Sequence, residues 1–336
     1  IRLLRNPSAI RNEVLLRNKK ITHIFIDEVQ RVPELLNEVH SLIESKTGAH
    51  FIISGSSARK LKRGQANLLA GRAWTYYLYS LTYRELKDQF SLTKALQLGT
   101  LPSVYLAEST EAAQKTLHSY VNTYLKEEIE QEALVRNLSN FLTFLALAAE
   151  ANGDIVHYTN ISREAGVTYM TVKDYFQILQ DTLIGFTLQP YAKSARARLA
   201  KHPKFYFFDT GVARAFLKKS AVPLAPQTKE YGKAFEHFII TEIKRTLEYR
   251  ELDCFLYFYR NSNQAEVDLI IERPDGQIFA LEIKATQNPN TTDLRGLKSF
   301  LEICPKAKPY LLCLVPNKSR IQSVDILPWQ EIFDIL

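Results

Sequence analysis

The sequence predicts an α/β protein built from several domains, and three patterns indicate this. Residues 21–27 form an apolar, β-branched run that ends in acids, as expected for a buried parallel strand. A helical pattern begins at Pro33, and residues 50–57 form a second apolar run that leads into small residues. A strand, a helix and a strand at this spacing indicate a parallel sheet. The last third of the chain adds another helix followed by strands.

Composition narrows the class of protein. The 336 residues are enough for two or three domains, and an apolar fraction of 46% excludes a disordered or collagen-like chain. No apolar run reaches the roughly 20 residues that span a bilayer, no signal peptide opens the sequence, and the cysteines are few and scattered. We therefore expect a cytoplasmic protein with no membrane partner. The net charge of +7 permits contact with a polyanion but does not require it.

The pattern along the chain predicts four domains. Residues 76–81 read as a further strand of the first domain, and residues 91–151 are helical in pattern, with little Gly or Pro. Pro223 and Pro226 lie in a polar stretch and mark a linker. The expected domains are a partial α/β domain over 1–90, a helical subdomain over 91–150, a winged helix-turn-helix module over 151–222 and a C-terminal α/β domain over 223–336.

Residues 161–179 have a helix-turn-helix pattern. A short helix ends at Gly166, and Thr168 can cap the next helix. Residues 186–208 can supply a two-stranded wing. Such modules contact DNA, but they also serve in dimerisation and packing. If the partner is DNA, we expect contacts from the start of the second helix and from the basic wing, namely from Thr168, Tyr169, Thr171, Lys173, Arg196 and Arg198.

The C-terminal domain is expected to consist of one long helix and several strands. The helix covers about 232–247, and Asp275 with Gly276 predicts the turn of a β-hairpin. Strands are expected near 255–260, 265–272, 278–284 and 309–315.

Two acids at the end of the first strand predict nucleotide chemistry. Asp27 can hold Mg²⁺ through water, and Glu28 can polarise the water that attacks ATP. Ser54, at the end of the next strand, is positioned to sense the γ-phosphate. Arg72 can reach a phosphate in cis or in a neighbouring subunit of a homo-oligomer. The alternative is a capped strand end with no catalytic role.

A second set of acids, in the last third of the chain, indicates a metal-dependent nuclease. Glu282 and Lys284 are two residues apart and share one face of a strand, with Asp268 on the neighbouring strand. Two acids that face one point can bind Mg²⁺, and a lysine beside them can stabilise the charge that develops on phosphate. Glu236, from the helix, completes a site that resembles the restriction-endonuclease-like, or PD-(D/E)xK, fold. The alternative is an exposed hairpin face that carries cross-strand charge pairs.

The order of the motifs resembles a family of prokaryotic proteins over nearly the whole chain. The N-terminal motifs look like those of the AAA+ ATPases of the AAA_14 family, and the remainder is similar to the DUF4143 domain that follows in those proteins. This resemblance implies a partial P-loop NTPase sheet, with ATP and Mg²⁺ as cofactors. The motifs lie at 25–30, 33–36, 54–57, 69–72 and 81–86 for the ATPase, and at 99–102, 206–211 and 232–236 for DUF4143.

One motif of the AAA_14 family is missing. Its members carry G-x-x-x-x-G-K-S/T upstream of the acidic strand, a loop whose backbone and lysine hold the β- and γ-phosphates. This sequence has no such loop, since Gly232 and Lys233 precede an alanine and open a helix in the last domain. Residues 1–20 are too few for the strand, loop and helix. We therefore expect a truncated ATPase, with loss of the motif as the alternative.

Three functions are compatible with these patterns. The first is an ATP-binding AAA+ protein that acts on DNA under nucleotide control. The second is a metal-dependent nuclease in which the ATPase-like domain is a scaffold. The third is a non-enzymatic DNA-binding or assembly module.

Overall fold

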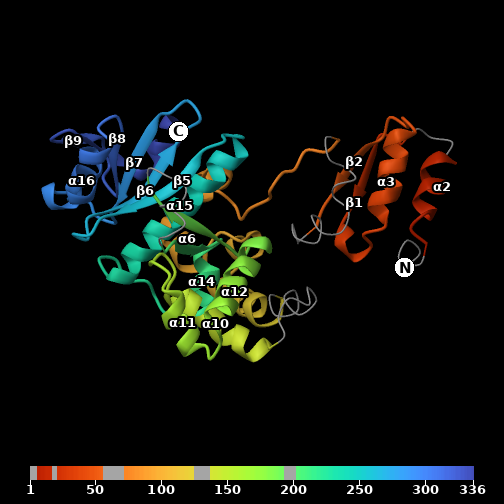
Figure 1. Cartoon of the computed structure of the whole chain (residues 1–336), viewed down its shortest axis with the longest axis horizontal. Helices are drawn as coiled ribbons and strands as arrows, with labels where there is room; N and C mark the ends of the chain where they lie inside the picture. Colours follow the sequence, from red (N-terminus) through yellow and green to blue (C-terminus); the bar gives the residue numbers. More distant parts are fainter. Residues whose placement is uncertain (1–5, 17–20, 56–71, 125–136, 193–201) are drawn as a thin grey trace. The chain divides into compact units, whose positions relative to one another are not determined.

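The computed structural model describes residues 6–16, 21–55, 72–124, 137–192 and 202–336. These residues form two compact units, and Figure 1 shows helices and strands in both. The first unit contains residues 1–76 together with 177–184, and the second contains 77–176 and 185–336. The predicted α/β class, with parallel strands, is confirmed.

The first unit is built on the predicted strand–helix–strand unit. β1 (His23–Ile26) and β2 (His50–Ile53) pair in parallel. The chain between them forms a short 3-10 turn, η1 (Val29–Arg31), and α3 (Leu35–Glu44). The inner face of α3 packs with α2 (Ala9–Leu15) and the strands into a small core that contains Ile10, Ile26, Leu35, Leu36, Val39 and Leu42.

Two expectations for this region are wrong. The strands are not buried on both sides, because Phe25 is 64% exposed and Ile52 is 52% exposed. Residues 76–81 form no strand. The Tyr79 amide, which would pair with another strand in the predicted structure, instead donates to the Tyr249 hydroxyl at 2.9 Å.

The predicted helical region is confirmed over its described residues. Serine and asparagine side chains cap its helices, because the first amides of a helix have no partner within it. Ser91, Ser109 and Asn137 each accept a hydrogen bond from an amide three residues further on. The elements are α5 (Tyr83–Leu86), η3 (Lys87–Gln89), α6 (Leu92–Leu98), α7 (Pro102–Tyr105), α8 (Thr110–Ser119), a π-helical turn η4 (Tyr120–Tyr124) and α10 (Leu138–Glu150).

The next elements are a helix pair and a pair of antiparallel strands. α11 (Tyr158–Glu164) and α12 (Tyr169–Asp181) are joined through Gly166, whose φ of +64° suits glycine. The predicted cap is confirmed, since the Thr168 hydroxyl accepts from the Thr171 amide at 3.1 Å. β3 (Gly185–Pro190) and β4 (Lys204–Phe207) then pair antiparallel.

β3 and β4 are not a free-standing wing, because they belong to one sheet of eight strands. That sheet has the order β4-β3-β5-β6-β7-β8-β10-β9, and β3 runs parallel to β5. The expected boundary at residue 222 therefore runs through a continuous sheet. The four predicted strands are confirmed and two short ones are added: β5 (Phe255–Arg260), β6 (Glu266–Glu272), β7 (Ile278–Ile283), β8 (Lys308–Cys313), β9 (Ser319–Ile321) and β10 (Val324–Pro328).

Two apolar clusters cover the faces of this sheet. Phe279 and Leu281 of β7 pack in the cluster of α15 (Lys229–Tyr249), while Ile278 and Ala280 pack in that of α16 (Arg295–Ile303). This alternation explains why the strand is apolar at successive positions. The remaining short elements are α14 (Thr210–Phe216), η5 (Thr291–Leu294), η6 (Trp329–Glu331) and α17 (Ile332–Ile335). Within the described ranges, no helix has the length and apolar character needed to cross a membrane.

A buried polar network joins α15 to the helical region. Arg245 is only 2% exposed, and its guanidinium donates to the Thr100 hydroxyl at 3.0 Å and to the Phe208 carbonyl at 2.5 Å. Asp209 accepts from the amides of Thr100 and Gly211 at 2.8 and 2.9 Å. These contacts bring α14 against α6 so closely that a side chain at Gly211 has no room, since its Cβ would lie 1.9 Å from the Leu98 carbonyl oxygen.

We predict opposite effects for alanine at two helical glycines. Gly211→Ala forces α14 and α6 apart and should lower the free energy of unfolding by about 2 kcal/mol or more. Gly232→Ala should raise it by about 0.5–1 kcal/mol, because Gly232 lies inside α15 with nothing within 4 Å of the added carbon. Urea denaturation of both variants measures the difference. Equal stability of the two variants would contradict this account of the α14–α6 contact.

Candidate functional site

The first candidate site lies at the carboxyl ends of β1 and β2. Asp27 and Ser54 follow directly on these parallel strands, and the Ser54 hydroxyl donates to Asp27 Oδ1. The Glu28 amide donates to the same carboxylate oxygen at 3.1 Å. The structure therefore brings together three of the residues that the sequence assigns to nucleotide chemistry. An exposed carboxylate beside a hydroxyl suits a hydrated Mg²⁺ ion, which prefers oxygen ligands.

Glu28 has a strained backbone. Its φ of +52° and ψ of +44° lie in the left-handed region, which non-glycine residues rarely adopt. Such strain costs on the order of 1–3 kcal/mol and tends to collect at functional sites. Eight other non-glycine residues of the described ranges also have positive φ, so this conformation does not distinguish a catalytic Glu28 from a capped strand end.

Arg72, in contrast, is bound to α3. Its guanidinium pairs with Glu44 at 2.6 Å and donates to Nε2 of His40 at 3.0 Å. In this arrangement Arg72 supports the helix, and contact with a phosphate requires that these bonds be exchanged.

The second candidate site is a cluster of acids and lysines in the second unit, here called the acid–lysine cluster. Lys284 lies beside two carboxylates, with its Nζ 2.6 Å from Glu282 Oε1 and 3.7 Å from Asp268 Oδ2. Lys204 lies beside two others, 3.3 Å from Glu236 and 2.5 Å from Glu266. The cluster consists of Lys204 on β4, Glu236 on α15, Glu266 and Asp268 on β6, Glu282 on β7 and Lys284 just beyond β7.

Burial distinguishes this cluster from surface ion pairs. Asp268 is 5% exposed, Glu282 6% and Lys204 3%. The alternative of an exposed hairpin face with cross-strand pairs is therefore wrong. From their order along the chain, Glu236, Asp268, Glu282 and Lys284 were predicted to lie in one site. In the structure, the charges of Glu236 and Lys284 both act on the carboxyl groups of Asp268 and Glu282.

The protonation of the cluster follows from its burial. Loss of water raises the pKa of Asp268, although Lys284 and the Ile283 amide, which donates at 2.8 Å, partly offset this rise. Loss of water, and then the neighbouring Asp268 carboxylate, raise the pKa of Glu282 well above its usual range. Burial lowers the pKa of Lys284, but the two carboxylates outweigh it and leave that pKa above its usual value. Both lysines are therefore charged and act as internal counter-ions.

The cluster meets only some of the requirements of a divalent-ion site. Glu282 Oε2 is buried without a hydrogen-bond partner in the described ranges, so it is available as a ligand. Nevertheless, no three Asp, Glu, His or Cys side chains of the described residues gather closely enough to hold a metal ion. Asp268 and Glu282 would hold Mg²⁺ as a pair, and Lys284 would have to move aside.

Sequence reasoning missed Lys204 and Tyr206 as members of this site. The Tyr206 hydroxyl donates to Glu236 at 2.7 Å, on the same oxygen that Lys204 approaches. The signal was a single lysine that opens an aromatic strand, residues 204–207, in which all four positions are buried. A buried lysine requires an anionic partner, and the partners here are Glu266 on β6 and Glu236 on α15.

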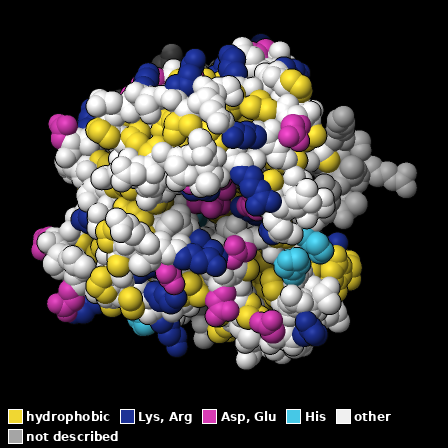
Figure 2. Space-filling model, turned by 90° about the vertical axis from the view of Figure 1, so that its left-hand side faces the viewer, with side chains coloured by type: hydrophobic (Ala, Val, Ile, Leu, Met, Phe, Trp, Pro, Cys, Tyr) yellow, Lys and Arg dark blue, Asp and Glu magenta, His cyan; other side chains and the backbone are white. Residues whose placement is uncertain are grey.

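The residues expected to contact DNA lie at the start of α12. Tyr169 is 39% exposed, and the Lys173 ammonium lies 4.8 Å from the centre of its ring. The Thr168 and Thr171 hydroxyls bond to each other at 2.9 Å. Arg196 and Arg198 lie outside the described residues. On the face shown in Figure 2, basic side chains are interspersed with acidic ones rather than gathered in a single basic patch.

Three stretches of the chain match known protein families. Residues 2–87 match the family described as AAA domain, AAA_14, and residues 231–332 match the domain of unknown function DUF4143. The resemblance to both families is therefore confirmed, and the first match indicates an ATPase-like, nucleotide-using region. Residues 89–222 match a separate domain of unknown function, DUF8612, so the DUF4143 region begins later than the resemblance implied.

Relatives of known sequence cover most of the chain. Two uncharacterized proteins, from Mycobacterium tuberculosis and Mycobacterium bovis, are each 26% identical over 303 residues, which are 90% of this chain and 66% of theirs. A protein of Haemophilus influenzae is 21% identical over 292 residues, or 81% of this chain and 68% of that protein. The chain thus spans just under two thirds of the length of its mycobacterial relatives.

A similarity to one solved structure is weak. The half-complex from a tetradecameric assembly of Thermococcus gammatolerans McrB AAA+ hexamers with bound McrC aligns with 91% of this chain and 93% of that chain. The sequence identity is 11% and the TM-score is 0.26, which is too low to support an argument about this protein.

The buried carboxylates predict a stability that falls as the pH rises. Their pKa values are raised in the folded state, so the folded protein binds more protons than the unfolded chain above the usual carboxyl value of 4.5. Part of the stability present at low pH is therefore lost as the pH rises past that value. Glu282→Gln should flatten this dependence, while Lys284→Met should steepen it, because it removes the counter-ion. Calorimetric melting temperatures across the pH range measure both effects, and Glu302→Gln, an exposed change on α16, is the control.

Unchanged slopes in both variants would contradict the assignment of these pKa shifts to the cluster. If Asp268 and Glu282 hold a divalent ion, Mg²⁺ or Mn²⁺ should raise the melting temperature most at high pH, where both acids are ionised, and should have no such effect in Glu282→Gln.

Proposed function

We propose that this protein binds ATP with Mg²⁺ through its N-terminal region, which matches an AAA domain, and acts on DNA through the rest of the chain. The proposal rests on the hydrogen bond between the Ser54 hydroxyl and the Asp27 carboxylate, which lie at the carboxyl edge of two parallel strands. Nucleotide sites of α/β folds lie at this edge. ATP hydrolysis would then control how the C-terminal part engages DNA.

Each residue of the nucleotide site has a distinct role in this proposal. Mg²⁺, when bound, neutralises charge on the phosphates. Asp27 holds the hydrated ion, Ser54 orients the Asp27 carboxylate and contacts the γ-phosphate, and Glu28 orients the attacking water. Arg72 takes its phosphate-contacting role in a homo-oligomer, where release from Glu44 accompanies assembly.

DNA contact is assigned to the start of α12. Thr168, Tyr169 and Thr171 offer hydroxyl groups and an aromatic ring, and Lys173 offers a charge for a phosphate. Arg196 and Arg198 add phosphate contacts in the same proposal. The pairing of Lys173 with Tyr169 supports it, since this exposed pair presents a cation and a flat ring together.

A second candidate function is metal-dependent cleavage of DNA, and the acid–lysine cluster favours it. Asp268 and Glu282 hold the metal ion in this candidate, Lys284 stabilises charge on the scissile phosphate, and Glu236 orients the water through its place beside Lys204. The burial of charged groups in one site costs desolvation free energy, and groups with shifted pKa values tend to cluster at functional sites. If neither site catalyses a reaction, the protein is a non-enzymatic DNA-binding or assembly module.

For the nucleotide site, we predict a separation of binding from turnover. In the full-length protein, Glu28→Gln should lower ATP hydrolysis by roughly a hundredfold or more and leave ATP binding intact, because a residue that orients water acts on the chemical step. Asp27→Asn should weaken the response to Mg²⁺ as well. A phosphate-release assay and calorimetric titration measure these effects, with the exposed Glu34→Gln on the same segment as control. The proposal would be contradicted if the full-length protein bound neither ATP nor DNA.

For the acid–lysine cluster, we predict that substitutions of its acids remove DNA cleavage without weakening DNA binding. Asp268→Asn and Glu282→Gln should abolish nicking of plasmid DNA in Mg²⁺ or Mn²⁺, while DNA affinity measured by fluorescence anisotropy stays unchanged. Unchanged nicking in both variants would exclude this site. Absence of nicking with either metal, together with an affinity that falls steeply as salt rises, would favour the non-enzymatic module.

A further inference from the structure

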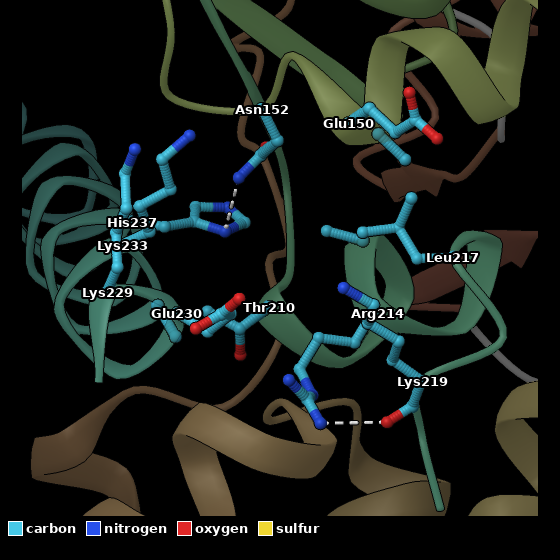
Figure 3. Close-up of a pocket in the computed structure, with 13 residues that line it drawn as sticks. Glu150, Asn152, Thr210, Arg214, Leu217, Lys219, Lys229, Glu230, Lys233 and His237 are labelled. Atoms are coloured by element: carbon cyan, nitrogen blue, oxygen red, sulfur yellow. Dashed lines mark hydrogen bonds between the residues drawn. The ribbon is translucent and has the colours of Figure 1, made fainter. Parts of the chain in front are cut away.

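A pocket between three helices of the second unit shares no lining residue with either candidate site. Figure 3 shows it with residues from the end of α10, from α14 and from the first two turns of α15 around it. Its volume is about 390 Å³, within the range of pockets that hold small molecules.

The walls of the pocket carry more positive than negative charge. Arg214 and Lys219 lie on one side, and Lys229 and Lys233 come from α15. Glu150 and Glu230 are the acids of the lining, so its formal balance is four positive charges against two negative ones. The start of a long helix adds positive potential to the α15 side.

Arg214 is the best-placed of these cations for an anion. One of its terminal nitrogens donates to the carbonyl oxygens of Lys219 and Val222, at 2.8 and 2.6 Å, and these bonds fix the guanidinium in place. Its Nε is buried and has no hydrogen-bond partner within the described part of the chain. Burial lowers the pKa of the Arg214 guanidinium, although Glu230 partly offsets this. A fixed, partly desolvated cation with an unmet donor favours an anionic ligand.

The neighbouring polar groups support binding rather than catalysis. The His237 Nε2 donates to the Phe207 carbonyl at 2.6 Å, and its Nδ1 accepts from Asn152 at 3.1 Å, so both ring nitrogens are engaged. Burial lowers the pKa of His237 to about 4, which leaves the ring neutral at pH 7. The Thr210 hydroxyl donates to the Ala95 carbonyl at 2.6 Å. The side chains of His237 and Thr210 are therefore not free to act as a base or nucleophile, and both form fixed parts of the pocket wall.

The remaining lining is apolar. Ala149, Ala213, Leu217 and Ala234 contribute it, beside the cations. The pocket is also larger than a bare phosphate ion requires. A ligand with a phosphate group at one end and a less polar body matches this division.

We infer that this pocket binds a phosphorylated small molecule of about the size of a mononucleotide, with its phosphate group held by Arg214 and Lys229. The site is separate from the nucleotide site at Asp27, and the inference does not depend on the function proposed for that site. Lys233 has a lesser part, because its ammonium is paired with Asp154.

The test is calorimetric titration of the whole chain with three probes: AMP, inorganic phosphate and adenosine. We expect AMP to bind more tightly than phosphate, and adenosine to bind weakly or not at all. Lys229→Gln should raise the Kd for AMP about tenfold, because it removes one charged contact. Ala234→Leu should also weaken binding, because it fills the cavity without a change in charge. Lys298→Gln, an exposed change on α16, should leave the Kd unchanged.

Arg214→Gln should abolish AMP binding but also loosens residues 219–222, so the conclusion is drawn from Lys229→Gln and Ala234→Leu. Asp27→Asn separates the two sites, since it should leave AMP binding at the pocket intact. The inference is overturned if AMP does not bind saturably, if adenosine or phosphate binds as tightly as AMP, or if the Kd is the same in both pocket variants. It is also overturned if Asp27→Asn alone removes AMP binding.

Discussion

The second unit depends on the burial of one guanidinium, that of Arg245. An arginine keeps its charge in a protein, so it must find acceptors wherever it is buried. Arg245 finds them in the Thr100 hydroxyl and the Phe208 carbonyl, which come from segments far apart in sequence. Glu242, one turn earlier on α15, is so desolvated that its pKa rises to about 7 and offers only part of the balancing charge. The backbone around Thr100 and Phe208 therefore has to converge on α15, and its position is fixed by polar as well as apolar contacts.

Once α15 is fixed in this way, it serves two sites along one helix. Its first turns line the pocket, and Glu236, which lies between the lining residues Ala234 and His237 in sequence, enters the acid–lysine cluster. His237 is neutral and is bonded at both ring nitrogens. Two lysines, Lys284 and Lys204, lie against the four carboxylates of the cluster and offset part of their negative charge. A divalent ion would therefore compete with an ammonium group, and the affinity of the cluster for metal depends on how readily Lys284 moves.

The sequence predicted the elements better than it predicted their surroundings. The order of Glu236, Asp268, Glu282 and Lys284 was enough to bring these residues together, because helix and strand periods fix which side chains share a face. Lys204 could not be found in this way, since its partners come from a helix and a strand distant in the chain. Residues 76–81 show the same limit, because their apolar pattern predicts a strand, whereas the Tyr79 amide bonds to the Tyr249 side chain. The exposure of Phe25 and Ile52 likewise depends on what covers the sheet and not on the strand itself.

The pairing of β3 with β5 has a mechanical consequence. A wing attached only by a loop can swing, but β3 shares backbone hydrogen bonds with the C-terminal sheet, and Lys204 of β4 is anchored to both Glu236 and Glu266. Rotation of this strand pair against the sheet would require these bonds to break. A displacement of β4 would therefore also move Lys204 and change the charge contacts of Glu236 and Glu266.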